Sequence, residues 1–89
     1  MDNGFLLYDE TEHTSTRYVG FVGEHARHDL AITSTAHFYG KKLVVDIQSG
    51  RTAILNDQEA ADVPYIMEAF RINDEQEATE FSEFLTSNL

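Results

Sequence analysis

Two apolar runs, residues 43–47 and 52–55, constrain the fold more than any other feature of the chain. They are joined by a turn that contains Ser49 and Gly50. β-Branched residues on both sides of a glycine-bearing turn are typical of a β-hairpin. Alternate side chains of a strand share one face. We therefore predict that the core face of the first strand is formed by Leu43, Val45 and Ile47.

The turn of this hairpin leaves two registers open. A two-residue turn pairs Val45 with Ile54, whereas a three-residue loop with a bulge pairs Val45 with Ala53. The bulged register is favoured because it brings better apolar pairs together. In both registers Asp46 lies on the face opposite the predicted core, and residues 51–52 are its expected neighbours.

Further strand patterns precede the hairpin. Residues 16–22 read as one strand, with Tyr18 and Val22 on the same face, and residues 30–35 read as the next. Residues 5–8 form a short apolar run that fits either an edge strand or a packed arm. Short strands with short links and no intervening helix are typical of an antiparallel meander.

The apolar period becomes helical after residue 56. Residues 57–62 are an acidic loop or a single helical turn, and residues 64–70 fit a short helix, with a strand as the alternative. Asn73 is a candidate cap for the last helix, with Gln76 as its capping-box partner. That helix carries one apolar stripe, formed by Ala78, Phe81, Phe84, Leu85 and Leu89.

Together these patterns predict one domain over residues 1–89. The predicted class is α+β: an antiparallel β-meander of about four to five strands packed against one or two C-terminal helices, in two layers. Eighty-nine residues are enough for a single core.

Charge is distributed unevenly over a chain with a net charge of −10. Residues 1–55 hold seven acidic and five basic side chains, whereas residues 56–89 hold nine acidic side chains and Arg71 alone. Such a surface repels nucleic acid and favours basic partners. The chain has no cysteine, which excludes disulfides and thiol catalysis. Without a signal-peptide pattern or an apolar run long enough for a membrane span, we predict a soluble, cytoplasmic protein.

Four segments resemble a small uncharacterised family of cytosolic proteins from Firmicutes. They are FLLYDETE, TRYVGFVGE, HFYGKKLVVDIQSGR and YIMEAFRI, and they extend over most of the chain. None is a catalytic motif. The resemblance therefore implies a cytosolic domain and assigns no substrate, cofactor or site.

Histidines and carboxylates supply the candidates for chemistry. His25 and His28, with a carboxylate beside each, are the first candidates for a metal site, although no distant third ligand is marked. The loop 9–13 offers carboxylates and an imidazole, but nothing around it suggests the burial that a general acid needs. Motifs of hydrolases and nucleotide-binding enzymes are absent. We predict no cofactor, no metal and no catalysis, with a small hydrolase or metal-binding protein as one alternative.

A second alternative is single-stranded nucleic-acid binding on an aromatic and basic sheet face. Stacking platforms of this kind combine aromatic rings with cations. The net negative charge opposes it, because phosphate neutralisation supplies most non-specific affinity. The residues that would form the platform are Arg17, Tyr18, Tyr39, Lys41 and Lys42.

The function predicted first is a small acidic binding or regulatory module that acts through protein–protein contacts. A basic protein partner would meet the acidic face of the last helix, at Glu77, Glu80 and Glu83. Self-association into a homodimer through a sheet edge or an aromatic face is a further expectation for a small open sheet.

Overall fold

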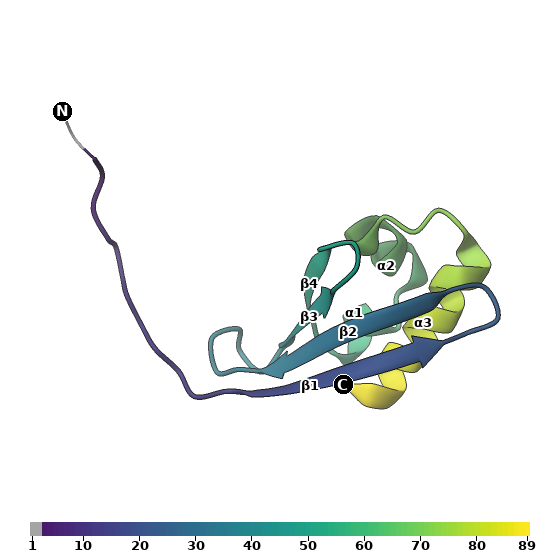
Figure 1. Cartoon of the computed structure of the whole chain (residues 1–89), viewed down its shortest axis with the longest axis horizontal. Helices are drawn as coiled ribbons and strands as arrows, with labels where there is room; N and C mark the ends of the chain where they lie inside the picture. The colour runs from purple at the N-terminus through teal and green to yellow at the C-terminus, as the bar shows by residue number, and fades with distance from the viewer. Residues whose placement is uncertain (1–2) are drawn as a thin grey trace.

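The computed structural model describes residues 3–89, which form a four-stranded antiparallel sheet followed by three helices (Figure 1). The predicted α+β meander is confirmed, with one helix more than expected. The strands lie in the order β1-β2-β3-β4. The elements are β1 (Ser15–Val22), β2 (Arg27–Ser34), β3 (Lys42–Asp46), β4 (Thr52–Leu55), α1 (Asp57–Ala60), α2 (Val63–Phe70) and α3 (Glu75–Asn88).

All three helices contribute buried residues to a core on one face of the sheet, which we call the inner face. On β2 the buried side chains alternate with partly exposed ones, so that Leu30 and Ile32 point inward. They share the core with residues of the helices, including Ile66, Phe81 and Leu85. The two layers predicted from the sequence are therefore a sheet and a helical layer, and the opposite, outer face of the sheet has no covering layer within residues 3–89.

The ends of the helices are fixed by side-chain caps. Residues 63–70 are a helix and not a strand, with Pro64 in its first turn as expected. The predicted cap at Asn73 is wrong by one residue. Asp74 is the N-cap of α3, and its carboxylate accepts a hydrogen bond from the backbone N–H of Gln76 at 2.9 Å. A charged acceptor at the positive end of the helix dipole explains this choice.

Both registers predicted for the β3–β4 hairpin are wrong. Val45 pairs with Thr52, one residue away from the bulged register and two residues away from the two-residue turn. The turn is longer, because the Asp46 carboxylate accepts hydrogen bonds from the backbone N–H groups of Gln48 and Ser49. Those two hydrogen bonds stabilise a loop over residues 47–50 that the apolar pattern alone does not reveal.

The predicted core face of β3 is also wrong. Val44 and Asp46 are the buried residues of this strand, and they point toward the helices. Leu43, Val45 and Ile47 lie on the outer face, where Ile47 is 51% exposed. The reason is the partner of Asp46, which is neither of the predicted residues 51–52 but a histidine on the neighbouring strand β2.

The two N-terminal strand predictions are confirmed, and β2 begins earlier than expected, at Arg27. Tyr18 and Val22 share the outer face, as predicted. Residues 3–14, which we call the arm, run away from the body in an extended path (Figure 1). The apolar run 5–8 is therefore neither an edge strand nor a packed segment, because each of its side chains is at least 75% exposed.

Candidate acidic groove

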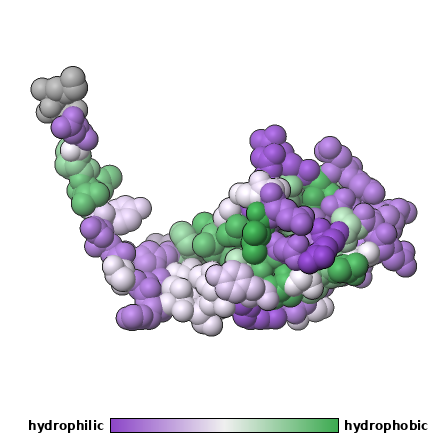
Figure 2. Space-filling model, in the orientation of Figure 1, coloured by the Kyte–Doolittle hydropathy of each residue, from purple (hydrophilic) through white to green (hydrophobic). Residues whose placement is uncertain are grey.

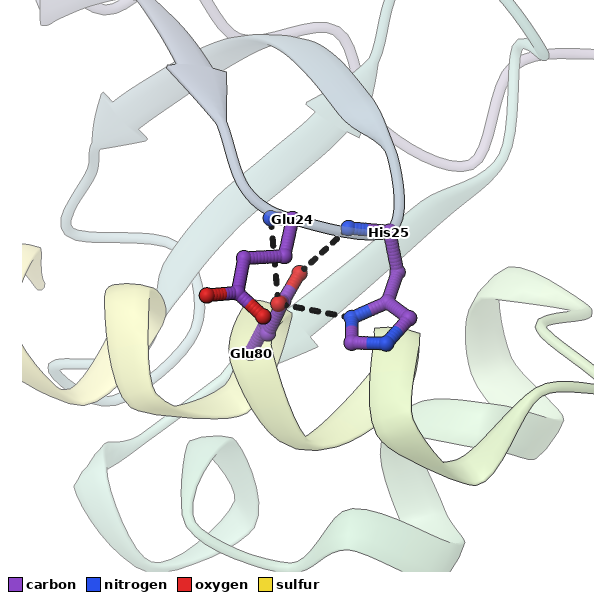
Figure 3. Close-up of side chains that lie close together, drawn as sticks. All are labelled: Glu24, His25 and Glu80. Carbon is purple, nitrogen blue, oxygen red and sulfur yellow. Dashed lines mark hydrogen bonds and ion pairs between the residues drawn. The ribbon is translucent and has the colours of Figure 1, made fainter.

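The turn of the β1–β2 hairpin is held to α3 by the carboxylate of Glu80. It accepts hydrogen bonds from the backbone N–H groups of Glu24 at 3.1 Å and His25 at 3.2 Å, and it contacts the His25 ring Nδ1 at 2.7 Å (Figure 3). Gly23 makes this approach possible, since a Cβ there would lie 2.3 Å from Glu80 Oε1. A glycine at this position is thus a packing requirement of the site.

The environment of this contact favours an ionised pair. The hydrogen bond to Glu80 is the main cause that raises the pKa of His25 above 6.5, and the same hydrogen bond is the main cause that lowers the pKa of Glu80 below 4.5. Each partner stabilises the charged form of the other. At a pH between 4.5 and 6.5 both groups are charged, so the contact is a salt bridge as well as a hydrogen bond.

The second histidine of the hairpin lies in a different environment. The ring of His28 is buried and stacks on Phe81, with 4.3 Å between centroids and 10° between planes. Its Nδ1 lies 3.2 Å from Asp46 Oδ2. Its Nε2 lies 3.1 Å from a carboxylate oxygen of Glu77, a distance that suits an ion pair, but the two groups are not aligned for a hydrogen bond. His25 and His28 therefore contact different carboxylates and do not form one site.

A groove of about 660 Å³ opens beside the His25–Glu80 contact, between the end of β1 and α3. Its apolar part contains the stacked rings of Phe21 and Phe84, whose centroids are 4.5 Å apart. Carboxylates surround those rings, and none of the residues that line the groove is basic. The lining residues are Phe21, Val22, Gly23, Glu24, Glu80, Glu83, Phe84, Ser87 and Asn88.

Three groups at the edge of the groove have the composition of a cation site. Ligand atoms of Glu24, His25 and Glu80 all lie within 4.8 Å of one another (Figure 3). Metal coordination requires the neutral imidazole, however, and the raised pKa of His25 favours the charged form. Both oxygens of Glu80 also accept hydrogen bonds from the hairpin. The donor set of these three residues is therefore poorly suited to a bound metal ion.

The structure separates the three glutamates that were predicted to meet a basic partner. Glu77 faces His28 and Glu80 holds His25, so both contact groups of their own chain. Glu83 is exposed and lines the groove. Sequence reasoning placed Glu24 beside a candidate metal-binding histidine and Phe84 in the apolar stripe of the last helix, but it did not predict that they meet Phe21 in one groove. The available signal was the polar connection after β1, which carries an acidic residue directly after a glycine.

The predicted nucleic-acid platform is not assembled on one face. Arg17 points toward the helices, where its Nη1 donates a hydrogen bond to a main-chain oxygen of α3 at 2.7 Å. Tyr18 points outward from the adjacent position. Lys41 forms an ion pair of 3.1 Å with a carboxylate of α1, and Lys42 is partly buried at the start of β3. Tyr39 is exposed in the β2–β3 loop, apart from the strand residues.

A second histidine–carboxylate cluster holds the root of the arm. The Glu12 carboxylate accepts hydrogen bonds from the Thr35 hydroxyl at 2.7 Å and the Ala36 N–H at 2.7 Å. His37 contacts Glu12 through Nδ1 at 2.6 Å and Glu10 through Nε2 at 2.9 Å. Two ring nitrogens that each face a carboxylate are both donors in the imidazolium form. The arm therefore leaves the body from a fixed point.

This cluster does not have the properties that a catalytic carboxyl group needs. The hydrogen bond from Thr35 is the largest cause that lowers the pKa of Glu12, to about 2, and the hydrogen bond to Glu12 raises the pKa of His37. A general acid at neutral pH needs a raised pKa. The arrangement is that of an anchor for the arm.

These observations define a small α+β protein whose sheet is covered by helices on one face and which carries an acidic groove beside its first hairpin. Residues 7–87 match the SAV0927-like family, and the chain belongs to this family. The match confirms the predicted relationship to a small uncharacterised family. Comparison with curated proteins found no match. Within residues 3–89, no helix has the length and apolar character needed to cross a membrane.

Proposed function

We propose that this protein is a single-domain binding module without catalysis of its own, and that it holds a basic segment of another protein in the acidic groove. The observation that carries the proposal is the combination of stacked rings, Phe21 on Phe84, with the rim carboxylates of Glu24, Glu80 and Glu83. This combination refines the predicted acidic face to one concave surface.

The chemistry of the groove suits an arginine side chain. The apolar stem of an arginine packs on aromatic rings while its guanidinium binds a carboxylate in a bidentate manner. Ligand atoms of Glu24 and Glu80 lie within 4.8 Å of each other, and the charged His25 ring beside them offsets part of their repulsion. The exposed carboxylate of Glu83 adds negative charge to the same groove, which gives basic ligands an electrostatic advantage over neutral ones.

Three other predictions remain proposals: the cytoplasmic location, the origin in Firmicutes and the binding of nucleic acid. A cytoplasmic location and an origin in Firmicutes fit the family but rest on the sequence. Nucleic-acid binding is disfavoured because its five candidate residues point in different directions and because the groove is acidic.

Our first prediction tests the groove with a defined probe, a short peptide that alternates arginine and leucine. Titration followed by NMR should shift the amides of the groove residues, and Glu83→Gln should weaken binding about two- to fivefold, as expected for one exposed ion pair. Added salt should weaken binding further. Shifts confined to residues outside the groove would contradict the proposal.

The matched control is Glu68→Gln, which removes the same charge from an exposed position on α2. Its affinity for the peptide should equal that of the wild type. An equal loss in both variants would mean that the peptide responds to net charge alone and would overturn the assignment of the groove.

A further inference from the structure

The outer face of the sheet is more apolar than a solvent-facing sheet surface usually is. Antiparallel sheets with one solvated face normally carry polar residues there. Here Tyr18 is 78% exposed, Val22 is 75% exposed and Ile47 is 51% exposed. The same face also carries partly exposed apolar residues of the central and edge strands, Leu43, Val45 and Ile54. The Arg27–Asp29 ion pair lies on the same face beside Val22, and the exposed apolar side chains around it mark an interaction surface.

The arm carries a second apolar surface, which the rest of the described chain leaves largely exposed. Its residues 5–8 are two aromatic and two leucine side chains, each between 75% and 88% exposed. Figure 2 shows a green stretch on the projecting segment, well separated from the body. Four consecutive exposed apolar residues are unfavourable in water unless another surface covers them.

The anchor at the root of the arm prevents the arm from covering its own sheet. Glu12 is held at the β2–β3 loop, and Glu10 contacts the other nitrogen of His37. Only Asp9 separates Glu10 from the apolar run, and a chain reversal requires about four residues. While the anchor is intact, residues 5–8 therefore point away from the sheet that they would otherwise cover (Figure 1).

The charge distribution selects which surface of a second copy receives the arm. Residues 56–89 have nine acidic side chains and one basic one, so the helical layers of two copies repel each other. Residues 1–55 have seven acidic and five basic side chains, and this half contains the sheet. Approach through the sheet is therefore the electrostatically permitted one.

The arm is large enough to stabilise such a contact. A buried aromatic side chain removes about 150–250 Å² from water. Two exchanged arms bring Phe5 and Tyr8 twice, together with Leu6 and Leu7 twice, and cover a similar area of the two sheets. Stable protein–protein interfaces bury about 1,200–2,000 Å² in total, and the exchanged arms supply a large part of such an area.

From these observations we infer that the protein self-associates by arm exchange, with residues 5–8 of one copy lying on the outer sheet face of another. This contact uses a different surface from the acidic groove on the side of α3, although Val22 at the end of β1 borders both. A failure of one proposal therefore leaves the other intact.

Our second prediction concerns the mass in solution. Light scattering of the full chain over a wide concentration range should give an integer multiple of the monomer mass. Leu6→Ser combined with Leu7→Ser changes no charge and touches no residue of the body, and it should raise the dissociation constant at least about tenfold. Tyr65→Ser, at a partly exposed residue of the helical layer, is the control and should leave the mass unchanged. A monomer at all concentrations, or an arm variant that associates like the wild type, would refute arm exchange.

A second measurement locates the contact. Because the chain has no native cysteine, Leu7→Cys gives a single attachment point for a nitroxide label. Mixed with isotope-labelled wild-type chain, the labelled chain should broaden amide signals of β1 and β3 in the other copy. Broadening confined to α2 and α3, or no broadening between chains, would exclude the proposed location.

Discussion

The two faces of the sheet differ in a way that apolar content does not anticipate. The outer face of β3 carries Leu43, Val45 and Ile47, yet the inner face, with Val44 and Asp46, is the one that the helices cover. The buried face is the more polar of the two. A buried polar pair, together with the residues that satisfy it, therefore selects the face of a strand when both faces are apolar enough to be buried.

The polar pair is completed by groups from three elements. His28 on β2 contacts Asp46 on β3, and its ring packs between that strand and Phe81 of α3. Asp46 also accepts two backbone hydrogen bonds from its own turn. If Asp46 pointed outward, His28 would remain in the core without its partner, which costs more than the exposure of Ile47.

The largest effect expected from this comparison is therefore at His28. His28→Ala should lower the free energy of unfolding by about 3 kcal/mol, because it removes the stack on Phe81 and leaves the buried Asp46 carboxylate without its side-chain partner. Chemical denaturation measures this difference. Asp29→Ala, one residue away on the outer face, should change stability by less than about 1 kcal/mol, since its ion pair is with the exposed side chain of Arg27. Equal effects at both positions would disprove the role of the polar pair.

Much of the fold follows from the sequence because the patterns involved are local. The strands at 16–22 and 30–35, the helix at 64–70 and the stripe of α3 all rest on the spacing of apolar residues within one element. The face of β3 depends instead on His28, which lies eighteen positions away from Asp46. The predicted register of the β3–β4 hairpin was wrong for the same reason. The turn is shaped by the buried Asp46 carboxylate and not by glycine alone.

The candidate site was less predictable than the fold. The acidic character of α3 and the residues Glu80 and Glu83 were evident from composition, and so were the histidines. Which glutamate faces which histidine depends on how the hairpin lies across the helix. The close approach of Gly23 to Glu80 is a tertiary contact with a weak local signal, since glycine after a strand more commonly marks a turn.

A matched pair of adjacent valines provides the next test of the two faces, with a smaller expected effect. Val44→Ala removes two methyl groups from a fully buried side chain and should cost about 2 kcal/mol of unfolding free energy. Val45→Ala makes the same chemical change on the outer face and should cost less than about 1 kcal/mol in the monomer. If arm exchange occurs, Val45→Ala should weaken self-association while Val44→Ala acts on folding. A larger stability loss at Val45 than at Val44 would reverse the assignment of the faces.

The smallest expected effect is the pH dependence of the His25–Glu80 contact, which holds the turn of the β1–β2 hairpin to α3. Because the pKa of His25 is raised above 6.5, its contribution to stability is fully present below that value and is lost as the pH rises through the raised pKa. Because the pKa of Glu80 is lowered below 4.5, its contribution is present above 4.5 and is lost as the pH falls through the lowered pKa. The hairpin should therefore be held most firmly at a pH between the lowered pKa of Glu80 and the raised pKa of His25.

Titration of the His25 ring by NMR checks this expectation directly. The wild-type ring should titrate above 6.5, and Glu80→Gln should move its pKa down toward that value, because the variant removes the main cause of the shift. Glu68→Gln removes the same charge from α2 and should leave the ring unaffected, since long-range effects of an exposed charge are screened by salt. A wild-type ring that titrates at or below 6.5 would mean that Glu80 does not hold the hairpin, and the inner face would then end at His28.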